Sequence, residues 1–156
     1  MTPHERWMSH ALKEAELAYR AKDVPVGAVV VYNGSIIGRG HNQVELMHDP
    51  TAHAEMIALT AATAHLESKW LKDCIFYVTM EPCPMCAGAI VLSRIATLVF
   101  GCYDPKMGAC GTLYAIPEDK RLNHRVHVIG GVLDRECGGL VKEFFAKKRT
   151  ATAAQQ

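Results

Sequence analysis

The stretch CIFYVTMEPCPMCAGAIVLSRI, residues 74–95, brings together a strand, a proline-rich turn and a helix. Residues 74–80 are nearly all apolar, which predicts a central strand of a buried sheet. The prolines of residues 81–86 end that strand, and the apolar run at residues 86–95 predicts the helix that follows. ATLVFGC, residues 96–102, predicts the next strand. This alternation is typical of an α/β protein.

The residues that precede this stretch predict a helix and a β-hairpin. Residues 5–20 carry apolar side chains at helical spacing. Two apolar strands, at residues 24–32 and 35–42, flank the dipeptide Asn33-Gly34. Asn-Gly favours the tight primed turn of a hairpin, so these two strands are predicted to pair.

Further helices and a strand complete the predicted fold. Asp-Pro-Thr, with its capping residues beside a proline, predicts the start of a helix over residues 49–68. A short strand is predicted at residues 125–132 and a closing helix at 133–149. The expected architecture is a mixed five-stranded sheet with helices on both faces, formed by one domain, residues 1–150. The polar tail, residues 151–156, is expected to be frayed.

The composition indicates an ordinary globular domain but does not identify a binding partner. The chain has 156 residues, 49% of them hydrophobic and 21% charged, with a formal net charge of +1, as in ordinary globular domains. A charge near zero does not point to nucleic acid unless the basic residues cluster. No signal peptide or membrane-spanning run is present in the sequence, so a cytoplasmic location is expected. Its six cysteines are therefore interpreted as thiols or metal ligands rather than disulfides.

Three residues have the types and positions of zinc ligands. Cys83 and Cys86 are three apart at the start of a predicted helix, where free amide groups favour thiolates. His53 lies near the start of the preceding helix, and Glu55 follows two residues later. Zinc suits one imidazole and two thiolates, and catalytic zinc sites commonly keep three protein ligands and leave one position for water. Glu55 is then the predicted general acid and base.

Other interpretations of these residues exist. A C-x-x-C pair also occurs in redox dithiols and in structural zinc knuckles, and a histidine near a helix start is often a surface residue. A structural zinc ion requires a fourth ligand, for which the candidates are Cys74, Cys102, Cys110, His48 and His65. None of these lies in a second ligand-like pair. The combination of H-x-E with P-C-x-x-C is the signature of zinc nucleobase deaminases, and it favours a catalytic site.

On these motifs the chain resembles the cytidine-deaminase superfamily. Within it, the sequence resembles the branch of bacterial tRNA-specific adenosine deaminases from VPVGAV through NHRV to the EFFAKKR helix. The resemblance implies a three-layer α/β/α fold and one zinc ion per subunit, held by His53, Cys83 and Cys86. It implies that Glu55 moves protons while adenosine at the wobble position of a tRNA anticodon, arginine tRNA in particular, becomes inosine. It also implies a homodimer.

The same resemblance implies a set of substrate contacts. Asn42 matches a residue that hydrogen-bonds the target nucleoside, and Val26 matches a pocket wall. Pro82 and the backbone at Ala54 match groups that border the base. Near the flanking nucleotides the resemblance places Asp104 and Lys106, whereas Cys102 and Tyr103 depart from the residues usual in this branch. By residue type alone, Asn42 can also simply end a strand, and Val26 is an ordinary core residue.

The closing helix combines an apolar stripe with basic residues. Leu140, Val141, Phe144 and Phe145 recur at helical spacing and are expected first of all in the core. The basic residues, among them Lys148 and Arg149, are by themselves an ordinary solvated face. With an anticodon stem-loop as substrate, the basic residues of this helix, Lys142, Lys147, Lys148 and Arg149, are expected to contact phosphates, and Phe145 is expected to reach the RNA.

Two rival functions remain open at this level. A small-molecule deaminase acting on guanine, cytosine or a nucleotide carries the same zinc motif, so the motif does not decide the substrate. A non-catalytic, zinc-stabilised RNA-binding module requires a fourth protein ligand and has no need of Glu55.

Overall fold

A computed structural model describes residues 1–155, which form one sheet of five strands with helices on both sides. The elements, in chain order, are α1 (Pro3–Arg20), β1 (Gly27–Tyr32), β2 (Ser35–His41), α2 (Val44–Met47), α3 (Ala54–Leu66), β3 (Ile75–Met80), α4 (Pro84–Leu92), β4 (Thr97–Cys102), the 3-10 turn η1 (Ile116–Glu118), β5 (His127–Ile129) and α5 (Asp134–Gln155).

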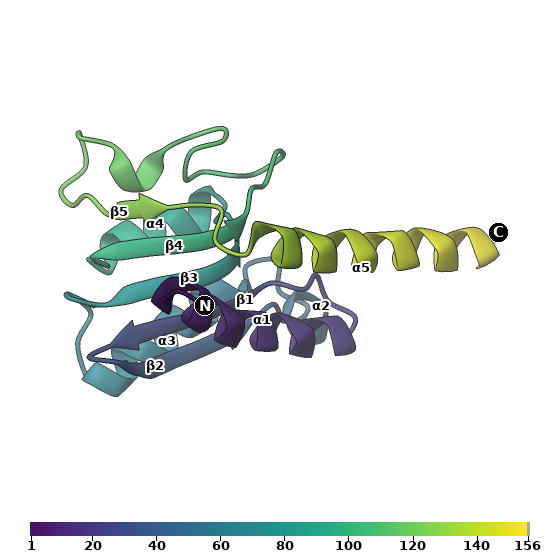
Figure 1. Cartoon of the computed structure of the whole chain (residues 1–156), viewed down its shortest axis with the longest axis horizontal. Coiled ribbons are helices and arrows are strands. Elements are labelled where there is room, and N and C mark those ends of the chain that lie inside the picture. Colours follow the sequence, from purple (N-terminus) through teal and green to yellow (C-terminus); the bar gives the residue numbers. More distant parts are fainter. Residues whose placement is uncertain (156) are drawn as a thin grey trace.

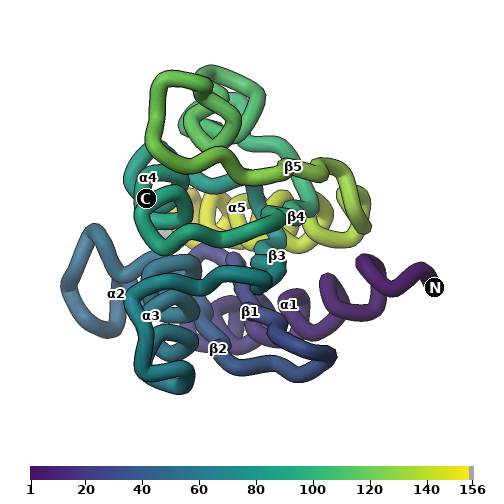
Figure 2. The backbone as a smooth tube through the Cα atoms, turned by 90° about the vertical axis from the view of Figure 1, so that its left-hand side faces the viewer, coloured from purple at the N-terminus to yellow at the C-terminus, as the bar shows by residue number. Residues whose placement is uncertain are grey.

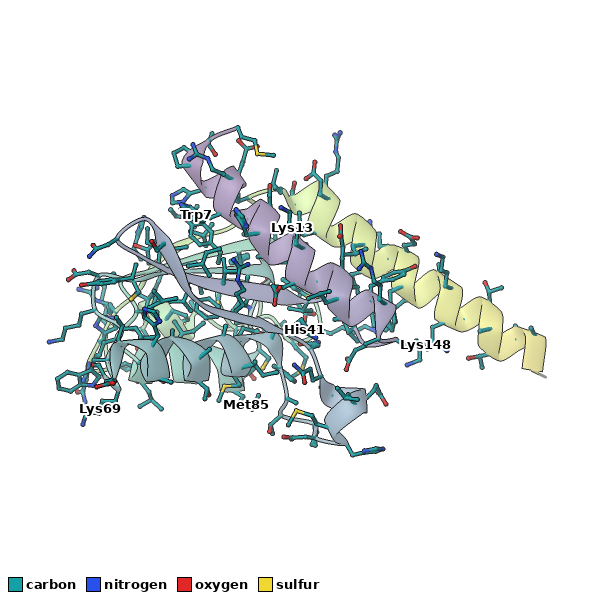
Figure 3. All side chains as sticks on the ribbon, turned by 90° about the horizontal axis from the view of Figure 1, so that it is seen from below. Trp7, Lys13, His41, Lys69, Met85 and Lys148 are labelled. Carbon is teal, nitrogen blue, oxygen red and sulfur yellow. The ribbon has the colours of Figure 1, made fainter. Side chains whose placement is uncertain are left out.

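The sheet is mixed, with the strand order β2-β1-β3-β4-β5. β1 pairs antiparallel with β2 and β3, whereas β3, β4 and β5 run parallel. Figure 3 shows α1 and α5 on one face of the sheet and α3 on the other; Figure 2 shows α3 and α4 together on that second side. The predicted three-layer α/β/α fold is therefore confirmed.

Alternation along the central strands explains why both faces are covered. In β1, Ala28 and Val30 lie in the core cluster shared with α3 and α4, whereas Val29 and Val31 lie in the cluster shared with α1. Successive side chains of a strand point to opposite faces, so a run of apolar residues needs a partner layer on each side. The continuous apolar strands of the sequence thus require two helical layers.

Glycines in β2 let α3 approach the sheet closely. A Cβ atom at Gly40 would collide with the backbone of Ala54 and Ala58, and one at Gly38 would collide with Ala58 and Ala62. The alanines supply the matching small surface on the helix, and all three are fully buried. This contact fixes the first turn of α3 against the end of β2, where the candidate ligand His53 lies.

The N-terminal helix and the hairpin form as their sequences predict. Thr2 and Glu5 make a capping box at the start of α1, each side chain accepting a hydrogen bond from the other's backbone N–H. Asn33 and Gly34 have φ angles of 49° and 74°, the left-handed conformation that a primed turn requires of both residues. β1 and β2 therefore pair on either side of this turn.

The predicted start of the second helix is wrong. The Asp49 carboxylate accepts hydrogen bonds from the backbone N–H and the hydroxyl of Thr51, at 2.8 and 2.7 Å, and so forms a local turn. The helix begins at Ala54, with His53 as its N-cap residue. The short helix α2 precedes this turn and was not predicted. His53 thus lies at the helix terminus itself rather than within the first helical turns.

The C-terminal helix also differs from expectation. Residues 151–155, expected to be frayed, are helical in α5, because alanines favour helix and each added residue extends an existing hydrogen-bond ladder. Residue 156, the last of the predicted tail, lies outside the described residues. The helix passes beyond the sheet, as Figure 1 shows. Its apolar stripe is therefore not core: Val141, Phe144 and Phe145 are only half-buried, and only Cys137 in this helix is buried among the described residues.

No helix in the described part of the chain has both the length and the apolar character needed to cross a membrane.

Candidate active site

One edge of the sheet carries a cavity of about 760 Å³. The carboxyl ends of β2, β3 and β4 meet there with the amino end of β1, as their pairing registers require. In α/β sheets this edge is the usual place for a ligand. The lining residues come from the strand ends, the first turns of α3 and α4, the segment after β4 and the side of α5; they include Val26, Asn42, His53, Glu55, Glu81, Cys83, Asp104, Lys106, Phe145 and Arg149.

Two helix N-termini bring the three predicted ligands together. His53 is the N-cap of α3 and Cys83 the N-cap of α4, and Cys86 lies in the first turn of α4. His53 Nδ1 lies 3.6 Å from Cys83 Sγ and 3.5 Å from Cys86 Sγ. The three ligand atoms lie within 4.8 Å of one another, which is close enough for a single metal ion to contact all three. No further histidine, cysteine, aspartate or glutamate of residues 1–155 joins this group.

The electrostatics of this group favour a cation. Hydrogen bonds from Cys86 and His53 lower the pKa of Cys83 to about 4, which favours its thiolate form. The hydrogen bond with Cys83, together with burial, raises the pKa of Cys86. The hydrogen bond with Cys83 also raises the pKa of His53. A metal ion bound to this group would displace the protons of its thiols.

Glu55 lies beside this group at the buried end of the cavity. Glu55 is 4% exposed, and burial raises the pKa of its carboxyl group to about 7. A carboxyl group with a pKa near neutrality can both accept and donate a proton. Its position in the first turn of α3 follows directly from the N-cap position of His53 two residues earlier.

Asn42 and Val26 lie on the cavity wall, where β2 ends and β1 begins. The side-chain oxygen of Asn42 accepts a hydrogen bond of 2.8 Å from the backbone N–H of Ala54. This bond satisfies one free N–H group at the start of α3 and holds the Asn42 amide in place. No hydrogen bond from its NH2 group to another described residue is present, so this group is free to donate to a ligand.

Four of the predicted residues lie outside the cavity lining. Cys86 and Ala54 are fully buried behind it, and Pro82 is also buried. The Pro82 carbonyl accepts a hydrogen bond of 2.9 Å from the backbone of Ala109, so Pro82 supports the loop after β4. Lys148 lines a separate hollow of about 350 Å³ on α5, next to Phe145 and Arg149. Figure 3 shows Lys148 on the part of α5 that passes beyond the sheet.

The remaining predicted contacts lie on the outer wall of the cavity. Asp104 accepts hydrogen bonds from the backbone N–H groups of Lys106 and Met107, at 3.0 and 3.2 Å, which makes a tight turn after β4. Phe145 and Arg149 are four residues apart on the side of α5 that faces this turn. The two segments, distant in sequence, thus border one opening.

The two residues that depart from the branch pattern do not line the cavity. Tyr103 packs edge-on against Phe100, with ring centroids 5.0 Å apart, and its hydroxyl lies beside Gly130. Cys102 is buried in the cluster formed with α1 and α5, next to Cys137. Neither departure therefore alters the cavity wall directly.

Sequence reasoning missed two buried carboxylates near the cavity, Asp23 and Glu81, which are 3% and 2% exposed. Asp23 accepts hydrogen bonds from the backbone N–H groups of Val24 and Glu45, at 2.8 and 3.0 Å, and so ties α2 to the start of β1. Glu81 accepts hydrogen bonds from the loop after β4. For Glu81, the sequence signal that could have been used is its place at the end of an apolar strand, directly before the proline-containing motif.

Comparisons with known proteins agree with this geometry. A model of the MafB19-like deaminase family matches residues 2–149. A tRNA-specific adenosine deaminase of Bacillus subtilis (strain 168) is 48% identical over 149 residues, covering 96% of this chain and 92% of the relative. One of Aquifex aeolicus (strain VF5) is 45% identical over 145 residues, covering 93% of this chain and 95% of the relative.

Solved structures give the same result. A structure from studies of A-to-I editing by tRNA:A34 deaminases at the wobble position superposes with a TM-score of 0.83 at 36% identity, covering 86% of this chain and 98% of that one. A guanine deaminase of Nitrosomonas europaea superposes with a TM-score of 0.80 at 25% identity, covering 93% and 85%. The His-Cys-Cys group, the buried glutamate and the relatives that share almost the whole chain place this protein in the family of tRNA-specific adenosine deaminases.

Proposed function

We propose that this protein hydrolyses adenosine to inosine at the wobble position of a tRNA anticodon, with arginine tRNA as the substrate. The observation that carries the proposal is the buried carboxylate of Glu55 beside the His53–Cys83–Cys86 group, at the inner end of a cavity. The relatives that match almost the whole chain are named for adenosine deamination in tRNA, and they support tRNA as the substrate, whereas the choice of arginine tRNA follows from the sequence resemblance alone.

The donor set fits zinc. Bond lengths of about 2.0–2.1 Å to nitrogen and 2.3 Å to sulfur, at a tetrahedral angle, separate the two donor atoms by about 3.6 Å. The structure has 3.6 and 3.5 Å between His53 Nδ1 and the two sulfur atoms. Three protein donors without a fourth among the described residues leave one position for water. When bound, zinc makes a water molecule nucleophilic near neutral pH.

The protein's own residues perform the proton transfers and the positioning. Glu55 accepts a proton from the attacking water and passes it to the ring nitrogen as oxygen bonds to the ring carbon that carries the amine. Glu55 then moves the second proton of that oxygen to the amine, the carbon–nitrogen bond breaks, and ammonia leaves. Because Glu55 is buried, bulk water does not compete for that proton. The free NH2 group of Asn42 orients the nucleoside, and Val26 packs against the base.

An RNA loop suits this cavity better than a duplex. The ligand group lies at its inner end, so the target base must leave its stack, and unpaired anticodon bases do so at little cost. Lys106 and Arg149 on the outer wall supply positive charge for the phosphates of the flanking nucleotides, and Phe145 offers an aromatic face to a base. We also propose a cytoplasmic location, since tRNA is the proposed substrate.

We further propose that the protein acts as a homodimer. Large apolar side chains on α4 and on the segment that follows β4 are exposed: Leu92 at 78%, Leu113 at 52% and Tyr114 at 58%. Such side chains commonly mark an interface between subunits. A monomer by light scattering at the concentration of the activity assay contradicts this part of the proposal.

The competing substrate is a free purine. Guanine deaminases share this fold, so the zinc group and Glu55 do not separate the two activities. The residues that can distinguish an RNA substrate from a free purine are on the outer wall, in the segment after β4 and in α5. A non-catalytic zinc module is disfavoured for two reasons. Its fourth ligand is not found among the described residues. Glu55 is buried but forms no ion pair with another described residue, so it has no evident structural role.

The deciding experiment compares substrates with zinc-loaded protein. One reaction contains an arginine-tRNA anticodon stem-loop with adenosine at the wobble position; the others contain free adenosine, guanine or cytidine. Inosine in the stem-loop alone, lost with Glu55→Ala, supports the proposal. Turnover of a free substrate, with no inosine formed in the stem-loop, contradicts tRNA as the substrate. No product in any reaction, with zinc bound, overturns the enzymatic function.

A further inference from the structure

Glu81 is a buried carboxylate that the proposed chemistry does not use. It follows β3 directly and precedes the candidate ligand Cys83 by two residues. Its Oε1 accepts hydrogen bonds from the backbone N–H of Asp104, at 3.0 Å, and from the Thr112 hydroxyl, at 2.5 Å. Its Oε2 accepts hydrogen bonds from the backbone N–H groups of Cys110 and Thr112, at 3.1 and 3.0 Å. Four donors thus point at one carboxylate.

The hydrogen bonds take the place of an ion pair. No lysine, arginine or histidine of residues 1–155 lies within ion-pair distance of Glu81. A buried charge without such a partner is costly unless hydrogen bonds satisfy it, and bonds to a charged acceptor are among the strongest. An ionised carboxylate is an acceptor only, so both of its oxygens suit this set of donors. A glutamine would turn one acceptor into a donor that faces other donors.

These bonds hold both ends of one loop, residues 104–112. Asp104 is tied at its start and Cys110 and Thr112 at its end, while Lys106 between them lines the cavity. The loop is also packed directly on the carboxylate: a Cβ atom at Gly108 would collide with the Glu81 side chain. Since Glu81 belongs to the same short segment as Cys83, the outer wall of the cavity is fixed relative to the ligand group.

We propose that Glu81 is a positioning residue for RNA: by clamping the 104–112 loop it sets where Asp104 and Lys106 meet the nucleotides that flank the target base. This inference rests on the proposed function. Glu81 acts through the loop and not on the reacting atoms, so its loss weakens the binding of the stem-loop more than it slows the chemical step.

The test combines substitutions on both sides of the clamp. Glu81→Gln removes the charge at constant size, and Thr112→Val removes one donor, with Thr112→Ser as a matched control that keeps the hydroxyl. Glu81→Gln should raise KM for the stem-loop at least about tenfold and leave kcat within about threefold, because it disrupts charge-assisted hydrogen bonds. Thr112→Val should raise KM about threefold, whereas Thr112→Ser should change it less than about twofold.

Hydrogen exchange tests the clamp independently of any substrate. In Glu81→Gln the amides of Asp104, Cys110 and Thr112 should lose protection by at least about tenfold, with the zinc content unchanged. Unchanged protection, or a fall in kcat without a rise in KM, overturns the inference. Loss of zinc in Glu81→Gln also overturns it, because Glu81 then supports the ligand group.

Two further results keep the inference separable from the proposed function. If Glu81→Gln does not fold, Gly108→Ala decides in its place: it drives a methyl group against the carboxylate and should raise KM and loosen the same three amides. If the unsubstituted protein does not edit the stem-loop, the proposed function fails, and with it the RNA role of Glu81. The hydrogen-exchange data then test only whether Glu81 holds the 104–112 loop in place.

Discussion

The contact between β2 and α3 makes a prediction that links packing to catalysis. Gly40→Ala places a Cβ atom against the backbone of Ala54 and 2.7 Å from the nitrogen of Ala58. Ordinary van der Waals contact begins at 3.4 Å and the Ala54 carbonyl oxygen lies closer still, so α3 must move away from β2 by at least about 0.7 Å at this end. His53 and Glu55 lie on the same turn and move with it.

The magnitude follows from that displacement. Overpacking of a close-packed core costs about 1–3 kcal/mol, which for a chain of this length lowers the melting temperature by about 2–12 °C. A shift of about 1 Å at a reacting group costs about a hundredfold in rate, so kcat should fall about ten- to a hundredfold. Gly38→Ala is the matched control: it collides with Ala58 and Ala62, further along the helix from His53.

The assay measures the melting temperature and kcat of both variants with zinc loaded. Both should lose similar stability, whereas Gly38→Ala should keep kcat within about threefold of the parent. A Gly40→Ala protein with unchanged kcat and melting temperature would refute the close approach of α3. Equal losses of kcat in the two variants would refute the link between the first turn of α3 and the chemistry.

Three further predictions concern Glu55, the zinc ion and the basic residues of α5 that are proposed to contact RNA. Glu55→Gln should retain zinc and lose at least about a hundredfold in kcat, as a proton-transfer residue does; loss of zinc would instead make Glu55 a ligand. Removal of zinc by a chelator should lower the melting temperature, and added zinc should restore it; an unchanged temperature in verified metal-free protein contradicts the site. Replacing Lys148 and Arg149 by alanine should reduce the slope of log K against log salt by about 1.4, the value for two phosphate contacts on a single strand. Lys147→Ala is the control, because Lys147 pairs with Glu143 at 3.1 Å, and an equal effect there contradicts the assignment.

Local sequence signals predicted the parts of the fold that local physics determines. Continuous apolar strands and an Asn-Gly turn each depend on a few neighbouring residues, and these elements formed close to the predicted positions. The helix over residues 49–68 was misplaced at its start because two capping patterns compete there. Asp49 bonds to Thr51 in a turn, and His53 takes the cap position instead.

The carboxylate clamp could not be predicted in the same way. Glu81 looks like one more polar residue after a strand, and its partners are 23 to 31 residues away in the chain. Those partners are mainly backbone N–H groups, which every residue except proline carries, so residue types give no sign of them. Likewise, the apolar stripe of α5 resembles a core stripe, and only the length of the helix beyond the sheet leaves it half-exposed.

The division of the site into two layers explains why its motif does not decide its substrate. The ligand group and Glu55 lie at the start of α3 and α4, which pack on one face of the sheet, and a guanine deaminase has a similar overall fold. The outer wall comes from the 104–112 loop and from α5, and Glu81 bonds the loop to the segment that carries Cys83. Differences in this wall can therefore change the substrate without altering the position of the ligand group, so a change of specificity is expected to require substitutions in the wall and none in the motif.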